Sequence, residues 1–219
     1  MKLTRMHITL ILGIITTLWF GVLLLQGTEV KAEHLAPFGT VVSALVVLSI
    51  LTEHWFWRIT WLNKAIFKTP DLRGTWHVEM KSEYVDPETG KQKDPIECYY
   101  CATQSLSKLQ MHLMTPESES WLIASSIDPS PKGLGFQISA VYTNRPGIHQ
   151  RGKKSEIHYG AFIMETHGDS DTQPSRIIGE YWTDRITRGA LECSLLTRKR
   201  HTLYSNAQNE LETACIKKP

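Results

Sequence analysis

In two segments of the sequence, every second residue forms a set that begins with apolar side chains and ends with side chains that carry a ring, an amide, a hydroxyl or a guanidinium group. The first set is apolar at its start and ends in Tyr142 and Asn144. The second ends in Tyr181, Thr183 and Arg185. A period of two places each set on one face of a β-strand. Because the apolar part of that face must be buried, we expect the polar ends of both sets to meet at one end of a core.

These residue types are suited to binding a planar, anionic molecule. A planar base stacks on Tyr or Trp, which contributes about 1–3 kcal/mol per base. An Asn amide reads the edge of a base, and an Arg guanidinium forks onto phosphate. The alternative is that the rings are ordinary core residues and the arginines are solvated turn residues. The predicted ligand-binding residues are Trp76, Tyr142, Asn144, Arg145, Tyr181, Thr183 and Arg185.

Residues suited to catalysis are present, but they follow no known catalytic pattern. Histidines and carboxylates offer possible bases, yet the sequence has no nucleophile elbow, no metal-spaced histidine pair and no phosphate-binding glycine loop. We therefore predict no catalytic residue, no bound metal and no cofactor, and treat an enzyme only as a further alternative. The possible bases are His77, His112, His149, His158, Glu79 and Glu165.

The pair Cys98 and Cys101 has the spacing of half a zinc site or of a redox pair. A structural zinc would need two more Cys or His ligands at a matching position, and the other histidines are scattered. A redox pair should open a helix in a βαβ unit, which the sequence does not show. We interpret the four cysteines as reduced cytosolic thiols.

The elements that position these residues are predicted to be β-strands. Polar and apolar residues alternate from about residue 74 onwards, and Pro, Gly, Asp and Ser mark the turns. Strands of this number and spacing favour an all-β, small closed antiparallel β-barrel of about eight strands, with a sandwich as the alternative. Gly74 and Trp76 also resemble the start of lipocalin-like barrels. The predicted strands are about 74–84, 96–103, 106–115, 120–127, 134–143, 156–165, 176–184 and 189–198.

Two long apolar runs precede the strands. The first extends from Ile8 to Leu25 and the second from Pro37 to Leu51. A bilayer core of roughly 30 Å needs about 20 mostly apolar helical residues, so both runs could span it. The joining residues 26–36 carry charges and cannot stay in hydrocarbon. The sequence therefore predicts an N-terminal transmembrane α-helical hairpin.

The orientation of the hairpin follows from its basic residues. Lys2 and Arg5 precede the first run, and Arg58, Lys64 and Lys68 follow the second. The positive-inside bias places both termini in the cytoplasm, as in a two-span protein of the inner membrane. A cleaved signal peptide is the alternative for the first run. The length of that run, and the second run behind it, favour a span because a signal h-region has only about 7–15 residues.

Small residues recur every four positions in both apolar runs. This spacing lets helix backbones approach closely in lipid. It indicates either packing within the hairpin or contact between hairpins of different copies. The predicted oligomerisation residues are Gly13, Thr17, Gly21, Gly39 and Ser43.

The chain has 219 residues and a formal net charge of +2, which favours no particular class of partner. Without the apolar runs, one soluble domain remains. We predict a hairpin over 1–62, a linker over 63–71, a ligand-sensing barrel over 72–200 and a C-terminal tail over 201–219. In that tail, residues 205–216 could form a short helix.

In this order and spacing, the sequence resembles the two-transmembrane, β-strand-rich effectors of CBASS, the cyclic-oligonucleotide-based antiphage signalling systems of bacteria. The resemblance spans nearly the whole chain, and it depends on the combination of features because no single motif is diagnostic. The features that carry it are the paired apolar runs and residues 70–76, 104–127, 142–146 and 179–189.

The resemblance implies a function for each part. A cytoplasmic barrel would bind a cyclic dinucleotide made by a partner nucleotidyltransferase, with no DNA or RNA polymer involved. Binding would assemble the hairpins into a homo-oligomer that disrupts the lipid bilayer of the inner membrane, killing the infected cell before phage mature. The main alternative is a membrane-tethered, lipocalin-like carrier or sensor of a small hydrophobic ligand.

Overall fold

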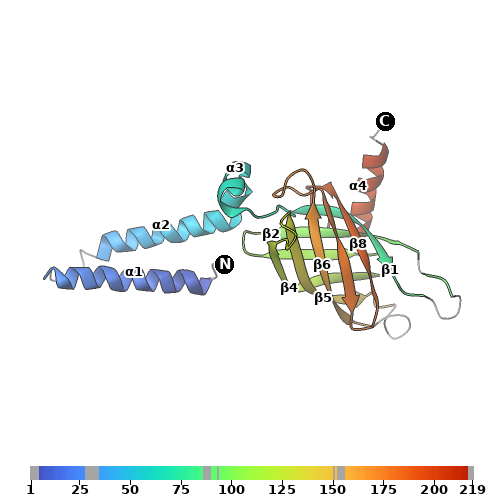
Figure 1. The fold of residues 1–219 in the computed structure, drawn as a ribbon, viewed down its shortest axis with the longest axis horizontal. Helices are drawn as coiled ribbons and strands as arrows, with labels where there is room; N and C mark the ends of the chain where they lie inside the picture. The colour runs from blue at the N-terminus through green and yellow to red at the C-terminus, as the bar shows by residue number, and fades with distance from the viewer. Residues whose placement is uncertain are drawn as a thin grey trace. The chain divides into compact units, whose positions relative to one another are not determined.

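The computed structural model describes residues 5–27, 35–85, 90–92, 94–149, 151 and 156–216, with the side chains of 5–12 and 35–38 left out. The chain divides into two compact units, Met1–Ile59 and Thr60–Pro219. The first unit is helical, and the second contains all the strands (Figure 1). Each unit is described by itself.

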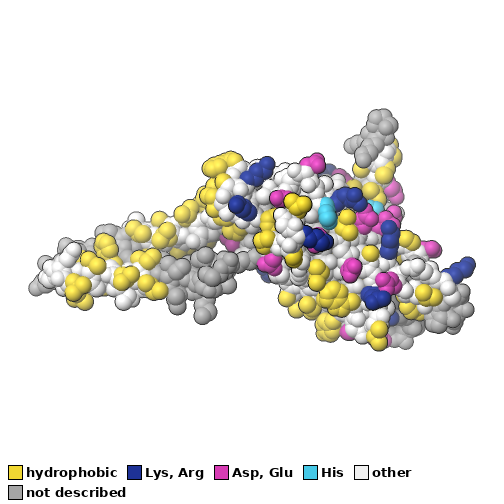
Figure 2. Space-filling model, viewed as in Figure 1, with side chains coloured by type: hydrophobic (Ala, Val, Ile, Leu, Met, Phe, Trp, Pro, Cys, Tyr) yellow, Lys and Arg dark blue, Asp and Glu magenta, His cyan; other side chains and the backbone are white. Residues whose placement is uncertain are grey.

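The first unit consists of helices α1 (Arg5–Leu25) and α2 (Leu35–His54), followed by the short 3-10 helix η2 (Phe56–Arg58). Among the described side chains, Gly39–Arg58 is long and apolar enough to cross a membrane, and Gly13–Leu25 is apolar but shorter. Apolar side chains lie on the surface of these helices (Figure 2). Their exposure fits association with a membrane. Most of the predicted hairpin turn, residues 28–34, lies outside the described residues.

The second unit is a closed barrel of eight antiparallel strands in simple sequential order, in which β8 returns to pair with β1 (Figure 1). All eight predicted strands are confirmed within a few residues, and closure excludes the sandwich. The barrel is preceded by α3 (Thr60–Leu62) and the π-helix η3 (Asn63–Phe67). The strands are β1 (Gly74–Ser82), β2 (Ile96–Gln104), β3 (Leu109–Met114), β4 (Ser118–Pro129), β5 (Phe136–Pro146), β6 (His158–His167), β7 (Arg176–Thr183) and β8 (Arg188–Thr197).

The barrel interior is filled by one alternate set of side chains from every strand. Ile138 and Ala140 of β5 and Ile177 of β7 are buried there, as their alternation predicted. Trp76 and Val78 of β1 share this interior and are fully buried. Burial of each large aliphatic side chain among them, such as Ile138, Ile177 or Val78, stabilises the fold by about 1.5–3 kcal/mol.

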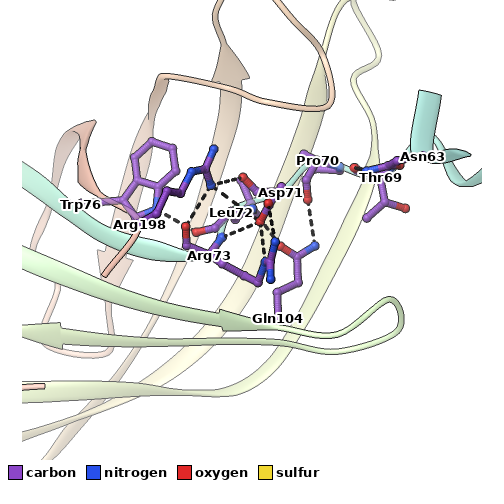
Figure 3. Close-up of polar contacts among 9 residues, drawn as sticks. All are labelled: Asn63, Thr69, Pro70, Asp71, Leu72, Arg73, Trp76, Gln104 and Arg198. Atoms are coloured by element: carbon purple, nitrogen blue, oxygen red, sulfur yellow. Dashed lines mark hydrogen bonds and ion pairs between the residues drawn. The ribbon is translucent and has the colours of Figure 1, made fainter. Parts of the chain in front are cut away.

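One end of the barrel is closed around Trp76. Its indole Nε1 donates a hydrogen bond of 2.8 Å to the carbonyl of Leu72 (Figure 3). The amide of Leu72 donates in turn to Gln104 Oε1 at 2.9 Å, and Gln104 Nε2 donates to Pro70 O at 2.8 Å. These buried bonds hold the segment that leads into β1 against β2.

The same segment is fixed from outside by an ion cluster. The guanidinium of Arg73 donates two hydrogen bonds of 2.8 Å each to the carboxylate of Asp71 (Figure 3). Arg198 donates to the carbonyls of Asp71 and Arg73, at 3.0 and 2.9 Å. Burial alone would raise the pKa of Asp71, but the hydrogen bonds from Arg73 and the charges of both arginines lower it overall. The carboxylate therefore stays charged and keeps the cluster intact.

A C-terminal helix, α4 (Tyr204–Ile216), confirms the short helix that the tail could form. It packs on the outside of β2, where the rings of Tyr204 and Tyr99 meet edge to face at 5.2 Å. Cys101 lies beneath it, whereas Cys98 points into the barrel. Residues three apart on a strand face opposite sides, so this pair cannot hold one ion between its thiols.

Candidate functional site

A cavity of about 600 Å³ opens at the end of the barrel opposite Trp76, where β1, β5 and β7 end. Its volume lies within the range of small-molecule sites. Beneath it the interior is packed, with a remaining void of only about 10 Å³. The barrel interior is therefore packed at one end and open at the other, and we call the opening the mouth cavity.

The structure brings five of the seven predicted ligand-binding residues together around this cavity. Four of the five lie on the inner faces of β5 and β7, as the alternation predicted, and the fifth, Arg185, lies in the turn that follows β7. They are Tyr142, Asn144, Tyr181, Thr183 and Arg185.

The other two predicted residues lie elsewhere. Trp76 belongs to the closed end, where its one polar atom is bonded to Leu72. Arg145 follows Asn144 on β5 and so faces outward, with its guanidinium 5.6 Å from the ring centre of Trp121. It lines an outer groove of about 390 Å³ that adjoins the cavity at the β3–β4 turn. Neither residue lines the mouth cavity.

The floor of the cavity is aromatic. Tyr142 stacks on Phe162 with ring centres 6.3 Å apart, and the ring of Tyr100 is tilted against Phe162 at the same centre-to-centre distance. Burial raises the pKa of Tyr142, and the neighbouring Tyr181 and Asp184 raise it further. Burial also raises the pKa of Tyr181, although a hydrogen bond with Ser82 opposes the shift. Both phenols therefore stay neutral and can donate hydrogen bonds.

One wall of the cavity is built around Asn144. Its Nδ2 donates to Ser118 Oγ at 3.1 Å and to Ser120 Oγ at 2.8 Å. Ser118 Oγ also lies 3.1 Å from Thr115 Oγ1 in the β3–β4 turn. Because both amide hydrogens are used, the side chain is fixed and its Oδ1 is the atom that could accept a further bond. A donor on the edge of a base would suit this position.

The opposite rim belongs to the β7–β8 turn. Thr183 and Thr187 join through their hydroxyls at 2.6 Å, and the amide of Arg185 donates to Thr183 Oγ1 at 3.2 Å. Arg185 is exposed and, among the described residues that line the cavity, is the only permanent cation. His158 also lines the rim, with its Nδ1 3.0 Å from Glu156 O. A carbonyl can only accept, so Nδ1 carries a proton and Nε2 remains for other contacts.

The residues that sequence reasoning missed come from several strands and turns, and those of the β3–β4 turn and the start of β4 form one wall. Ser118 and Ser120 complete the Asn144 wall, yet the inner face of β4 is hard to identify because the strand bulges between Leu122 and Ala124. A bulge changes which alternate set faces inward. The turn that contains Ser118 was visible in the sequence only as a turn.

The candidate bases do not converge. His77 and His112 lie on outer faces, 3.6 Å from Glu97 and 3.4 Å from Glu119 respectively, and His149 is exposed. Within the described residues, no group of His, Cys, Asp or Glu side chains is arranged to hold a metal ion.

Comparison with known proteins agrees with this geometry. A family model described as Cap15, cyclic dinucleotide receptor domain, matches residues 67–195, which is more than half of the chain and nearly all of the barrel. No curated protein matched the chain. The chain belongs to the Cap15 family of CBASS effectors, and its barrel is a cyclic dinucleotide receptor domain.

Proposed function

We propose that the chain is an antiphage effector whose barrel binds a cyclic dinucleotide in the mouth cavity. In this proposal, binding drives oligomerisation of the N-terminal helices and disruption of the inner membrane. The observation that carries it is the convergence of Tyr142, Asn144, Tyr181, Thr183 and Arg185 on one cavity of a cyclic dinucleotide receptor domain.

The polarity of the cavity suggests how the ligand lies. Its floor is formed by rings such as Tyr142 and Tyr181, and its rim carries Arg185 and His158. A cyclic dinucleotide has two planar bases and two anionic phosphodiesters. The bases would stack towards the floor, with about 1–3 kcal/mol from each. The phosphodiesters would remain near the rim, where Arg185 can fork onto one of them.

The polar groups of the cavity walls support a nucleotide ligand over a lipid. A carrier of a hydrophobic molecule needs predominantly aliphatic walls, because unpaired polar groups oppose apolar contact. Here the fixed amide of Asn144, the hydroxyl pair of Thr183 and Thr187 and the guanidinium of Arg185 all reach the cavity. These groups support an anionic ligand with hydrogen-bonding edges.

The helices are the part of the chain that could act on the membrane. A Cβ added at Gly13, Gly21 or Gly39 would meet no described atom within 4 Å. Thr17 uses its hydroxyl within its own helix, donating to Gly13 O at 2.9 Å. The small residues of α1 therefore face open space in the single chain, which supports contact between copies rather than packing of α1 on α2.

Assembly must be linked to binding through a difference in affinity. A ligand shifts an equilibrium only as far as it binds one state more tightly than the other. The barrel would thus hold the ligand better in the assembled form, and the helices would oligomerise in response. This scheme needs a nucleotidyltransferase partner, an inner membrane location with both termini cytoplasmic, no cofactor and no catalysis by the chain itself.

Calorimetry on the full chain in detergent tests the proposal directly. The titrants are 3′,3′-linked cyclic dinucleotides with purine–purine, purine–pyrimidine and pyrimidine–pyrimidine base pairs, and the matching linear dinucleotides are the control. We expect saturable heat with at least one cyclic member and weaker binding of its linear form. Absence of heat with the whole cyclic panel would count against the proposed ligand.

A further inference from the structure

Tyr142 and Gly160 are direct partners across the β5–β6 pair. A Cβ added at Gly160 would overlap the Cζ and hydroxyl of Tyr142, and would also lie 2.8 Å from Trp182 O. The phenol of Tyr142 therefore occupies the space that any side chain at Gly160 would need. The ring lies against the wall of the neighbouring strand because that residue is a glycine.

The second tyrosine of the floor repeats this arrangement. Tyr181 and Gly189 are direct partners across the β7–β8 pair. A Cβ added at Gly189 would lie 2.9 Å from Cε1 of Tyr181 and would overlap the carbonyl of Lys81. The rings of Tyr142 and Tyr181 thus each pack against a glycine of the next strand in the sequence.

A third glycine in the barrel provides a contrast. Gly179 of β7 lies opposite Met164 and Leu191, and an added Cβ there would overlap Ile163 O and atoms of Met164. The three atoms nearest to the added Cβ belong to Ile163 and Met164 and not to a tyrosine of the floor. Crowding alone is therefore a general property of barrel glycines, whereas contact with a cavity ring is specific to Gly160 and Gly189.

We propose that Gly160 and Gly189 are positioning residues for the ligand, acting through Tyr142 and Tyr181; this inference rests on the proposed binding of a cyclic dinucleotide in the cavity. A substituent at either glycine would push its ring away from the wall and into the space that a base needs. The two glycines thus determine how deep the mouth cavity is. They favour ligands with bulky, flat groups at the floor.

The test compares Gly160→Ala with Gly179→Ala in the full chain in detergent. Calorimetry with the 3′,3′-linked cyclic dinucleotide panel measures affinity, and urea unfolding measures stability. Both variants should lose stability because both crowd the barrel. Only Gly160→Ala should lose affinity, by about tenfold or more, as expected when one stacked base is displaced. Equal affinity losses in the two variants would reduce Gly160 to a structural residue and overturn the inference.

A double-mutant cycle keeps the test decisive if Gly160→Ala folds poorly. The double variant Gly160→Ala with Tyr142→Ala should recover the part of the lost stability that comes from the clash between the new Cβ and the ring, whereas the close approach to Trp182 O remains. Additive losses of stability would contradict the inference. If the wild type binds no member of the panel, the proposed function fails in that form, and the cycle alone decides whether Gly160 positions Tyr142.

Discussion

Asn144 donates a hydrogen bond of 2.8 Å to Ser120 Oγ from a side chain that is only 8% exposed. Ser118 receives the second amide hydrogen, so two strands and a turn hold one amide in one orientation. A group that is fixed before the ligand arrives loses little conformational entropy on binding. This wall is the most rigid polar part of the cavity.

Asn144→Ala should weaken ligand binding through loss of this amide. The lost contact, together with two hydroxyls left without their donor, should cost about 1–3 kcal/mol in affinity. Calorimetry of the full chain in detergent measures the change. Thr143→Ala is the matched control, because Thr143 precedes Asn144 on β5 and belongs to the other face of the strand. An unchanged affinity in Asn144→Ala would remove this residue from the site.

Arg185→Gln should reduce both the affinity and its dependence on salt. Arg185 supplies the permanent positive charge at the described rim, and charge contacts to phosphate weaken as salt rises. Arg188→Gln is the matched control on the same hairpin, since Arg188 is bonded to Glu83 and does not line the cavity. Relative to the wild type, only Arg185→Gln should bind more weakly and show a smaller decrease in affinity between low and high salt. Equal salt dependence in both variants would contradict a phosphate contact at Arg185.

Trp76→Phe should destabilise the barrel and leave ligand affinity unchanged. The indole is fully buried at the closed end, and its Nε1 bond to Leu72 would be lost. Leaving a buried carbonyl without its donor, together with the smaller ring, should lower the free energy of unfolding by about 1–3 kcal/mol. Urea unfolding and calorimetry separate the two effects. A large loss of affinity at unchanged stability would return Trp76 to the ligand-binding residues.

Stability should fall at high pH because of the buried thiol of Cys98. Burial, with a smaller effect from Glu97, raises its pKa from 9.0 to about 12. Below pH 9 the thiol is protonated in both states, so its contribution is fully present. As pH rises further, the unfolded chain releases a proton that the folded chain keeps, and stability declines by up to about 1.4 kcal/mol per pH unit.

Urea unfolding at several pH values, compared between wild type and Cys98→Ala, measures this slope. The variant should show a shallower decline above pH 9, although other buried thiols and phenols retain part of it. Cys215→Ala is the control, because Cys215 is exposed. If Cys98→Ala keeps the full slope, the thiol does not ionise in the way its burial implies.

The fold was predictable because the barrel interior imposes a strict period of two. On β5 and β7 the alternation identified both the strands and their inner faces, including the positions of Tyr142 and Tyr181. Strand ends were less certain, since turn residues tolerate pairing over one or two more positions. Closure of β8 on β1 could be expected from strand number but not from any one residue.

The candidate site was only partly predictable for the same physical reason. Alternation places a residue on a face but does not tell which end of the barrel is open. Trp76 shares the inner face with Met80, yet the first lies at the closed end and the second at the cavity. Arg145 was predicted from its residue type although it falls on the opposite alternate set from Asn144. Cross-strand pairs such as Tyr142 with Gly160 require the register, which the sequence does not state.

Replacing Gly13 and Gly21 together by Leu should block assembly while ligand binding persists. A Cβ added at either glycine meets no described atom within 4 Å, so we expect the larger side chains to be tolerated in the single chain. Between copies, however, two Leu side chains would hold the helix backbones apart. A loss of about 1.4 kcal/mol of contact energy corresponds to tenfold weaker assembly.

Cross-linking and dye release measure this effect in vesicles that contain the full chain and a saturating cyclic dinucleotide. Ile14→Leu is the matched control, because it changes an exposed apolar residue beside the stripe and conserves its volume. We expect the control to assemble and release dye like the wild type, and the double variant to do neither. Calorimetry should still show saturable binding in all three proteins, because the barrel has its own core and the described lining of its cavity comes from the barrel unit. The double variant should bind more weakly only by the amount that assembly adds to the affinity. A normal oligomer in the double variant would show that the helices meet through another face.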